Sequence, residues 1–367
     1  MAPSTTRRRA RFNDLTISQV RTLTDDAIEV TFAVPEDLVD DYSYSPGQYI
    51  ALRATIEGED VRRSYSICQA PVTGELKVGI KRDFGGLFST WALANLKPGM
   101  KLAVMMPEGS FVSQQLKPGA HFVAIAAGSG ITPVIALIES ALASDPHSRF
   151  SLIYSNRTAM ETMFVDDLAD LKDRYPTRLA LHHVLTREMR SSELLSGRLD
   201  GEKINDILEQ LISPTDVNEW FICGPFDLVQ LVRDTLADHG VAPDEIRFEL
   251  FTTGRPEGPG GQSGKPVVVE AGQDVHTITF RLDGTSATVT TPLRSNESIL
   301  NAALRVRSDV PFACAGGVCG TCRATVVSGT VNMLENYALE PEEIERGYVL
   351  TCQSIPTSKL VEINYDS

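Results

Sequence analysis

Four cysteines near the C-terminus have the residue type and spacing to hold an iron–sulfur cluster: Cys314, Cys319, Cys322 and Cys352. The first three lie in CAGGVCGTC, a C-x4-C-x2-C spacing, and the fourth follows after 29 intervening residues, in LTCQ. This is the ligand spacing of a plant-type 2Fe–2S cluster, in which four thiolates hold two irons. The small residues between the first three cysteines let the backbone fold over the inorganic sulfides and leave amide N–H groups to bond sulfur. We therefore expect this part of the chain to carry one electron at a time.

Two other uses of these cysteines fit less well. A disulfide framework needs an oxidising compartment, and a structural zinc site usually pairs two short C-x2-C arms, whereas this chain has one. The remaining cysteines, Cys68 and Cys223, lie far apart in apolar or turn contexts. Their placement indicates reduced thiols and a cytoplasmic protein.

Length and charge narrow the class of protein. A chain of 367 residues is too long for one ordinary domain. Its formal net charge of −14 argues against binding to nucleic acid or to anionic membranes. We expect residues 1–10 to be a disordered tail, because no apolar stretch follows their arginines as a secretory signal would require. The longest apolar run, 122–143, contains a Gly-Ser-Gly turn and a proline, which predicts strand, turn and helix rather than a membrane span.

Two domains are predicted before the cluster domain. Residues 11–115 alternate apolar and polar positions at 28–34, 50–56, 76–80 and 102–106, which predicts a small antiparallel barrel. Residues 116–251 instead alternate short apolar runs, at 122–127, 150–154, 179–185 and 220–223, with helical spacing at 131–142, 160–171 and 228–237. That alternation predicts a parallel sheet covered on both faces.

A linker and a third domain are expected to follow. Residues 252–266 are dominated by Gly, Pro and polar residues, which is typical of a fairly flexible linker. In the domain at 267–367 we expect strands at 277–282 and 287–290, a helix at 298–304, the cluster loop, a strand at 324–327 and an acidic helical turn at 342–346. The fold class is thus multidomain α+β and α/β.

Within the predicted barrel, two motifs could bind a phosphate-bearing ring cofactor. RSYS (63–66) follows a strand, and GGLFS (85–89) lies about twenty residues on, at a strand-to-helix junction. A tyrosine can cover a flat ring, an arginine can pair with a pyrophosphate, and a helix N-terminus with small residues can bind the other phosphate oxygens. The expected cofactor-binding residues here are Arg63, Ser64, Tyr65, Ser66, Val78, Ile80, Lys81, Gly85, Gly86, Leu87 and Ser89.

Two further motifs belong to the predicted parallel sheet. AAGSGITP (126–133) lies between a strand and a helix, where glycines let the backbone approach a phosphate. CGP (223–225) ends another strand, at the carboxyl edge where open α/β sheets bind ligands. The expected nucleotide-binding residues here are Gly128, Ser129, Gly130, Thr132, Pro133, Cys223, Gly224 and Pro225.

In this order, RSYS, GGLFS, GSGITP and CGP resemble the ferredoxin–NADP reductase superfamily. The resemblance implies an FAD-binding barrel and a nicotinamide-nucleotide domain; with the fused ferredoxin unit, a β-grasp domain, it covers essentially the whole chain. Four further runs, LIYSNRT (152–158), GRLDGEK (197–203), ENYALEP (335–341) and GYVLTCQ (347–353), are similar to the family of reductase components of bacterial phenylacetyl-CoA epoxidases. In that family FAD receives hydride, and the cluster passes single electrons to a separate di-iron oxygenase, which is the expected partner.

The resemblance also implies roles for single residues. Arg63, Tyr65 and Ser66 would hold flavin and its phosphate, and Gly86 and Ser89 would lie on the pyrophosphate. Thr132 would lie near the isoalloxazine and the nicotinamide. Glu249 and Phe251 match the segment FELF that returns to the flavin, and Cys223 would lie near the nicotinamide C4 atom. Ser66, Cys223 and Glu249 are therefore the expected catalytic residues.

The charged residues that follow the second and third predicted strands of the parallel sheet favour NADPH over NADH as the nucleotide. A 2′-hydroxyl is usually held by an acidic residue after a sheet strand, and a 2′-phosphate by arginine. Ser155, Asn156 and Arg157 follow one strand without an acidic residue, and Thr186 and Arg187 follow the next.

Other functions stay open at this stage. The chain has no E-x-x-H pair that would indicate a di-iron site of its own. It could be the reductase of another oxygenase, such as a ketosteroid or aromatic-ring hydroxylase, or an electron carrier without enzymatic activity. In the cluster domain, 12 acidic residues against 7 basic ones predict an electrostatically steered encounter with the acceptor.

Overall fold

The computed structural model describes residues 12–83, 85–115, 117–190, 192–251, 273–307, 310–312, 317 and 320–367. The expected tail at 1–10 and linker at 252–266 lie outside these residues. The chain divides into two compact units, of which the first holds Met1–Ile56 and Ser64–Thr253, and the second Glu57–Arg63 and Gly254–Ser367. Each unit is described by itself.

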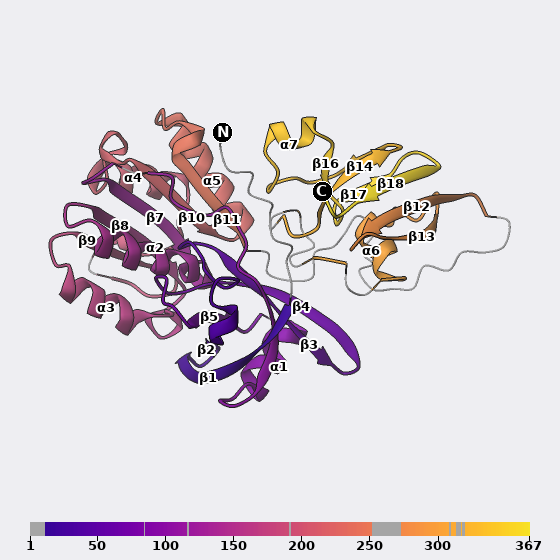
Figure 1. Cartoon of the computed structure of the whole chain (residues 1–367). Helices are drawn as coiled ribbons and strands as arrows, with labels where there is room; N and C mark the ends of the chain where they lie inside the picture. The colour runs from indigo at the N-terminus through magenta and orange to yellow at the C-terminus, as the bar shows by residue number, and fades with distance from the viewer. Residues whose placement is uncertain are drawn as a thin grey trace. The chain divides into compact units, whose positions relative to one another are not determined.

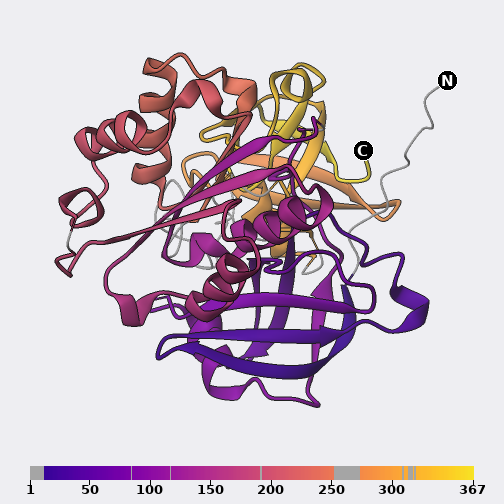
Figure 2. The same cartoon turned by 90° about the vertical axis from the view of Figure 1, so that its left-hand side faces the viewer.

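The N-terminal part of the chain forms a six-stranded sheet with the order β4-β3-β6-β1-β2-β5. Its strands are β1 (Phe12–Thr24), β2 (Ala27–Ala33), β3 (Tyr49–Ile56), β4 (Glu59–Ser66), β5 (Glu75–Lys81) and β6 (Lys101–Met105), with α1 (Leu87–Asn95) between the last two. The sheet curls toward closure, because Ile67, just past β4, forms an antiparallel bridge with Val78 in β5 (Figure 2). The four expected strands and the antiparallel pairing are confirmed.

Apolar side chains two positions apart explain this sheet, although in β2 the intervening Glu29 and Thr31 are buried as well. Val30 and Phe32 of β2 and Ile50 and Leu52 of β3 are fully buried. The two strands not anticipated from apolar spacing, β1 and β4, carry many polar residues and only a few buried ones. RSYS was expected to follow a strand and instead forms the last four residues of β4.

The next part of the chain is a five-stranded parallel sheet with the order β11-β10-β7-β8-β9. Its strands are β7 (His121–Ala127), β8 (Arg149–Asn156), β9 (Leu179–Leu185), β10 (Glu219–Gly224) and β11 (Ile246–Leu250), and its helices are α2 (Ile131–Ser144), α3 (Val165–Arg174), α4 (Gly201–Gln210) and α5 (Phe226–Asp238). The helices cover both faces of the sheet (Figure 1). Because both faces are buried, the strands have the continuous apolar runs that the sequence shows.

The expected helices at 131–142 and 228–237 are confirmed, as α2 and α5. The prediction of a helix at 160–171 was wrong at the start of the helix. Residues 159–161 form a short 3-10 turn, η3, and α3 begins only at Val165. Phe164 has a φ of 57° there, and this left-handed residue separates the turn from the helix. Helix α4 and strand β11 were not anticipated; Asp200 caps α4 by accepting a hydrogen bond from the Lys203 N–H at 2.9 Å.

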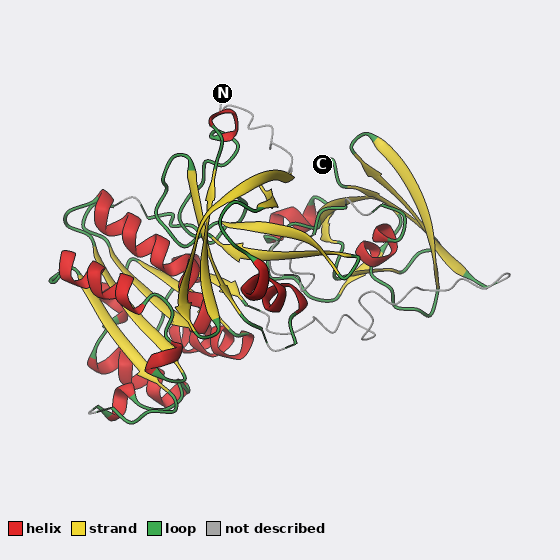
Figure 3. Ribbon diagram, turned by 90° about the horizontal axis from the view of Figure 1, so that it is seen from below, coloured by secondary structure: helices red, strands yellow, loops and turns green. Residues whose placement is uncertain are grey.

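The second unit contains a five-stranded mixed sheet with the order β13-β12-β18-β14-β16 and a separate pair, β15 with β17. Its elements are β12 (Val275–Leu282), β13 (Thr285–Pro292), α6 (Ile299–Leu304), β14 (Arg323–Ser328), β15 (Val331–Met333), α7 (Pro341–Glu345), β16 (Tyr348–Leu350), β17 (Ser354–Pro356) and β18 (Leu360–Asn364). Strands predominate among the described residues of this unit, and α6 and α7 are short (Figure 3). The expected strands and helices are found, whereas β15 to β18 were not anticipated.

Helix length in the structure also bears on membrane insertion. Within the described part of the chain, none of the helices has both the length and the apolar character that a membrane crossing requires.

Candidate active site

The strand order brings the sheet motifs to one edge. All five strands are parallel, so their carboxyl ends meet at the same side of the sheet. Following the order from β11 to β9, that edge carries FELF, then CGP, then GSG, then Ser155 to Arg157, and then Thr186 and Arg187. Motifs that are about 120 residues apart in the sequence thus form one continuous row.

The two glycines of GSG, in the 3-10 turn η2 (Gly128–Gly130), are required for different physical reasons. Gly128 has a φ of 53°, and a Cβ there would meet no atom within 4 Å. A Cβ on Gly130 would come within 2.2 Å of the Cys223 carbonyl oxygen. Gly130 therefore lets α2 start against the end of β10, while Gly128 leaves open backbone that a phosphate can approach. The Tyr154 hydroxyl donates to the Gly128 carbonyl at 2.9 Å and fixes this turn.

Three expected catalytic residues lie together. Ser66, at the end of β4, donates from its Oγ to Glu249 Oε2 at 2.9 Å, and the Cys223 Sγ lies 4.0 Å from the same carboxylate oxygen. Glu249 pairs with Cys223 in the β10–β11 register, which fixes their spacing. Burial raises the pKa of the Cys223 thiol, and the Glu249 carboxylate raises it further. Cys223 is therefore a neutral thiol and not a nucleophilic thiolate.

The barrel approaches the same edge through β5. A Cβ on Gly79 would lie 2.7 Å from Thr132 Cγ2, so this glycine lets β5 pack closely against the first turn of α2. Thr132 is buried, and its Oγ1 donates to the Ser129 carbonyl at 3.0 Å. Lys81 Nζ, two residues along β5, donates to the Glu161 carbonyl at 3.3 Å in η3 (Ala159–Glu161). Phe251 lies at the same edge, where its N–H donates to the Gly224 carbonyl at 2.9 Å.

Three of the expected cofactor-binding residues, Tyr65, Gly86 and Ser89, lie at the start of α1. The Tyr65 ring, from β4, lies 5.7 Å from the Phe88 ring of α1, centroid to centroid. Gly86 is the N-cap of α1 and, as a glycine, offers no capping side chain, and the first turn contains no acidic residue. The Ser89 hydroxyl accepts from the Asp83 N–H at 3.0 Å and so shapes the turn that contains Gly85.

These residues fit a phosphate-bearing flavin. The first turn of α1 contains no anionic side chain that could bind the N–H groups at the helix N-terminus. These N–H groups are therefore suited to bind a pyrophosphate. The Ser64 hydroxyl is buried without a hydrogen-bond partner among the described residues. Val78 and Ile80, by contrast, are fully buried in the barrel, so only their backbone could meet a cofactor.

The positions after β8 and β9 are joined by hydrogen bonds. The Arg187 N–H donates to the Arg157 carbonyl at 2.8 Å, and the Thr186 N–H donates to the Asn156 carbonyl at 2.9 Å. The Arg157 side chain is 65% exposed, and its Nη1 lies 3.9 Å from Glu161 Oε2. Arg187 is exposed as well. Two cationic side chains therefore lie on neighbouring loops at the carboxyl edge.

In the second unit, two of the four cysteines expected to bind the cluster can be described. Cys322 and Cys352 are buried in the same apolar core and form no disulfide. The Thr351 hydroxyl donates to the Cys322 carbonyl at 2.9 Å, which ties the two segments together. Cys314 and Cys319 lie outside the described residues. Buried cysteines without a disulfide fit thiolate ligands of a cluster.

Sequence reasoning missed two residues that shape the site, Gly79 and Tyr154. A single glycine inside a strand pattern is a signal for close backbone approach, and Gly79 carried that signal. Tyr154 gave none, because a tyrosine within an apolar run is indistinguishable from an ordinary core residue until its hydroxyl partner is known.

Comparison with known proteins agrees with this geometry. Residues 14–112 match the sequence model of the oxidoreductase FAD-binding domain, residues 124–234 that of the oxidoreductase NAD-binding domain, and residues 280–357 that of the 2Fe-2S iron-sulfur cluster binding domain. The chain is thus an NAD(P)H-dependent oxidoreductase with an FAD domain, a nicotinamide-nucleotide domain and a 2Fe–2S domain.

Its relatives place it more narrowly. The chain is 42% identical to a component of the 1,2-phenylacetyl-CoA epoxidase of Escherichia coli (strain K12), over 97% of this chain and 98% of the relative. It is 34% identical to the ferredoxin reductase component of the 3-ketosteroid-9-alpha-monooxygenase of Mycobacterium tuberculosis (strain CDC 1551 / Oshkosh), over 96% of both. The chain belongs to this family of reductase components of oxygenase systems. Its electron path therefore runs from a nicotinamide nucleotide through FAD to the cluster, and an oxygenase is the expected acceptor.

A solved structure supports the fold. Phthalate dioxygenase reductase covers 96% of this chain and 98% of its own, with a TM-score of 0.58 and 22% sequence identity. At that identity the likeness concerns the three-domain architecture alone.

Proposed function

We propose that this chain takes electrons from NADPH and passes them, through FAD and the 2Fe–2S cluster, to a di-iron oxygenase that epoxidises phenylacetyl-CoA. The observation that carries the choice of acceptor is the 42% identity to the epoxidase component over nearly the whole chain, against 34% for the ketosteroid enzyme. The di-iron nature of the acceptor rests on the same resemblance. We place the protein in the cytoplasm, in keeping with the absence of a disulfide among the described cysteines.

The barrel residues would bind the flavin. FAD held by these residues would supply two-electron acceptance from a nicotinamide nucleotide and one-electron release to the cluster. Tyr65 would cover the flavin ring, and Arg63 with the α1 N-terminus, at Gly86 and Ser89, would hold the phosphates. The proposal is supported by the contact of Tyr65 with α1 and by the absence of an acidic residue from the first turn of α1.

Ser66, Cys223 and Glu249 would line the place where nucleotide and flavin meet. The Ser66 hydroxyl donates to Glu249, so the serine orients the carboxylate. Cys223 presents a neutral thiol, small and uncharged, next to it. Glu249 Oε2 would be held in place by the Ser66 hydroxyl, while the packing of Gly79 on Thr132 keeps the barrel against the sheet.

Arg157 and Arg187 would select NADPH by binding its 2′-phosphate. The hydrogen bond between their backbones holds the two loops together. An arginine–phosphate contact is a charge-assisted hydrogen bond that NADH cannot make. Ser155 and Asn156, both buried at the end of β8, would support these loops.

The domain boundaries that we propose are 11–115 for the barrel, 116–251 for the nucleotide domain, 252–266 for the linker and 267–367 for the cluster domain. Each of the three matched family regions falls inside one of these spans. Limited proteolysis of the whole chain, with fragment masses, tests the boundary between the last two domains.

The acceptor is tested by reconstitution. The purified protein is mixed with the phenylacetyl-CoA epoxidase oxygenase of the same cell, and NADPH consumption is followed with and without phenylacetyl-CoA. We expect consumption coupled to epoxide formation. A ketosteroid monooxygenase is the control acceptor, because 34% identity to its reductase makes it the second candidate. Coupling to that oxygenase alone would replace our proposal.

The nucleotide preference is tested by Arg157→Gln. We expect KM for NADPH to rise roughly tenfold, the worth of one charge-assisted hydrogen bond, and KM for NADH to change little. Arg149→Gln is the matched control, since Arg149 is an exposed arginine at the opposite end of the same strand. An equal change for both nucleotides would refute the assignment.

A further inference from the structure

One arginine of the first unit binds carboxylates from both of its domains. Arg21 of β1 donates from Nε and Nη2 to the two carboxylate oxygens of Glu29, each at 3.1 Å, and Glu29 is its direct partner in the β1–β2 register. The same Nη2 atom donates to Asp167 Oδ1 at 2.8 Å and to Oδ2 at 3.1 Å. Glu29 belongs to the barrel, whereas Asp167 lies in α3 of the nucleotide domain. The guanidinium therefore joins the two domains through charge-assisted hydrogen bonds.

The surroundings of this arginine keep it charged. Burial, the largest influence, lowers the pKa of Arg21, but the hydrogen bonds and charges of Glu29 and Asp167 together raise it above its ordinary value. Glu29 is only 6% exposed, so its carboxylate depends on the guanidinium that faces it. The Asp167 side chain is 30% exposed. Asp167 can therefore be replaced without leaving a buried charge unpaired, which makes it the residue to change.

The start of α3 is the part of the nucleotide domain that Arg21 holds. Phe164, the residue before α3, has a φ of 57° and a ψ of 27°, a left-handed conformation that is rare for a bulky residue. Such conformations persist where the surrounding structure holds them, and they cluster at functional sites. Asp167 follows three residues later, in the first turn of α3. Arg21 thus anchors a turn that its own residue types do not favour.

The same turn packs against the strand that is expected to meet the flavin. A Cβ on Gly79 of β5 would lie 3.1 Å from Met163 Cε and 3.3 Å from Phe164 Cε2. The Tyr154 hydroxyl, which donates to the Gly128 carbonyl at 2.9 Å, lies 3.5 Å from the Met163 carbonyl oxygen. The turn before α3 therefore contacts β5 directly and the GSG turn through Tyr154.

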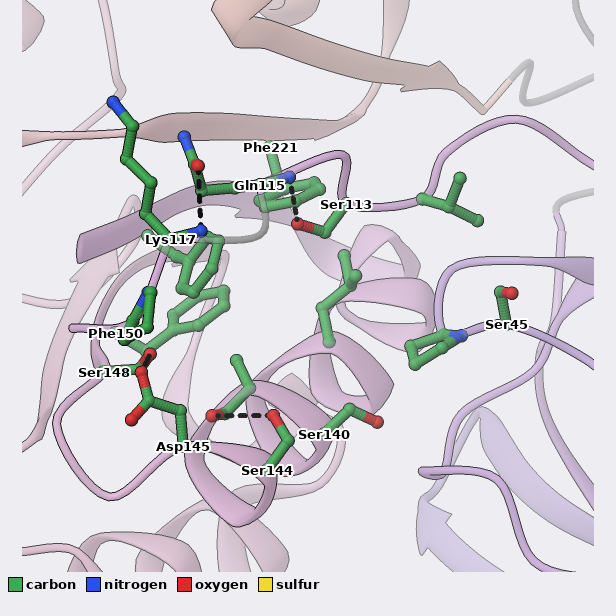
Figure 4. Close-up of a pocket in the computed structure, with 16 residues that line it drawn as sticks. Ser45, Ser113, Gln115, Lys117, Ser140, Ser144, Asp145, Ser148, Phe150 and Phe221 are labelled. Carbon is green, nitrogen blue, oxygen red and sulfur yellow. Dashed lines mark hydrogen bonds between the residues drawn. The ribbon is translucent and has the colours of Figure 1, made fainter. Parts of the chain in front are cut away.

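The interface between barrel and nucleotide domain is hollow elsewhere. A cavity of about 550 Å³ is lined by Ser45 and Pro46 of the barrel and by Ala141 of α2. Figure 4 shows Ser45 on one side of this cavity and Ser140 and Ser144, from α2, on another. Because packing is incomplete there, specific polar contacts at α3 carry more of the task of fixing how the two domains meet.

We propose that Arg21 is a positioning residue for hydride transfer from the nicotinamide nucleotide to FAD. By holding Asp167, it keeps the turn before α3 against Gly79 and so fixes the approach of the GSG edge to the flavin strand. Hydride transfer moves one proton with two electrons from the nicotinamide ring to the flavin, and its rate depends steeply on the alignment of the two rings. The inference rests on the proposed binding of flavin by the barrel, and not on the acceptor or on the choice between NADPH and NADH.

The test follows flavin reduction by stopped flow in the full-length holoprotein, without oxygen, against increasing NADPH and, separately, NADH. Asp167→Ala should lower the limiting rate constant roughly tenfold, because a small misplacement of reacting groups is costly in rate. The apparent Kd for the nucleotide should stay nearly unchanged. Asp167→Glu keeps a carboxylate for Arg21 and should retain most of the rate. A purely structural role would lower Tm without this split between rate constant and Kd.

Asp166→Ala is the matched control, since Asp166 is an exposed aspartate in the same turn of α3. It should leave the limiting rate constant unchanged. A normal limiting rate constant in Asp167→Ala, an equal fall in Asp166→Ala, or a change in Kd alone would overturn the role of Arg21.

A second variant covers the case that Asp167→Ala does not fold. Asp167→Asn removes the charge and keeps the shape, and it should lower the limiting rate constant about threefold. A normal rate constant in that variant would also overturn the inference. Wild-type flavin that neither nucleotide reduces would instead refute the proposed electron path on which the inference rests.

Discussion

At the residue scale, one half-buried carboxyl joins two parts of the first unit. Glu139, on α2, accepts from the Ala70 N–H of the barrel at 2.7 Å through Oε2. Burial raises the pKa of Glu139, although this hydrogen bond and the nearby Lys77 oppose the shift. Asp167 adds to the rise and Arg174 opposes it. The protonated form is therefore favoured by folding.

This raised pKa predicts a pH-dependent stability. A carboxyl whose pKa is higher in the folded than in the unfolded state contributes stability that is complete below the unfolded pKa and is lost as pH rises through the folded pKa. Glu139→Gln keeps an acceptor for Ala70 and cannot ionise. We expect a higher Tm than wild type at about pH 8 and an equal Tm near pH 4, measured by thermal unfolding across that range.

The control for this prediction is Glu36→Gln, since Glu36 is an exposed glutamate of the barrel. It should leave the pH profile of Tm unchanged. If Glu139→Gln proved less stable than wild type on the alkaline side, the negative charge would be stabilising and our argument wrong.

At the scale of elements, most of the fold could be predicted, and the exceptions have local causes. Strands with apolar residues at every second position, such as β2 and β5, and continuous apolar runs, such as β7, follow from the faces that they bury. The start of α3 did not, because Phe164 adopts a left-handed φ that nothing in its type signals. Strand β11 alternates apolar and charged residues over only five positions, which is too short to stand out.

The candidate site also has one part that could be predicted from the sequence and one part that could not. Its motifs could be found because phosphate sites need glycines and helix starts, and their common edge follows from parallel strands. The contact between Ser66 and Glu249 could not be predicted from residue types, because 183 positions separate them and only the approach of β4 to β11 joins them. That approach depends on the close packing of β5 on α2.

Gly79→Ala tests this packing. The new Cβ would lie 2.7 Å from Thr132 Cγ2 and 3.1 Å from Met163 Cε. Overpacking of this kind costs about 1–3 kcal/mol, so we expect a lower midpoint of urea unfolding and slower reduction of ferricyanide by NADPH. Adding Thr132→Ser removes the clashing methyl group and should restore most of the lost stability. A double variant no more stable than Gly79→Ala would show that the strain arises elsewhere.

At the scale of the whole molecule, acidic residues outnumber basic ones. The chain has a formal net charge of −14, and the second unit contains the acidic helix α7. Glu340, Glu342 and Glu345 are exposed there. Glu343 differs, because it pairs with Arg323 of β14. Three exposed carboxylates, near the fourth expected cluster cysteine in the sequence, are thus available to an acceptor.

We expect these carboxylates to steer the encounter with the oxygenase. Raising NaCl from about 0.05 M to about 0.5 M should slow reduction of the oxygenase several-fold, because salt screens attraction between exposed charges over about 10 Å or less. Ferricyanide reduction, which needs no protein docking, serves as the reference in the same stopped-flow measurement.

The double variant Glu342→Gln, Glu345→Gln should reduce this salt dependence and leave the rate at high salt unchanged, since neutral side chains gain nothing from low salt. Glu202→Gln with Glu209→Gln removes two exposed carboxylates from α4, in the other unit, and is the matched control for net charge. Equal loss of salt dependence in both double variants would assign the effect to net charge. Loss in the α7 variant alone would assign it to the surface beside the cluster domain's last cysteine, and with it the docking of the acceptor.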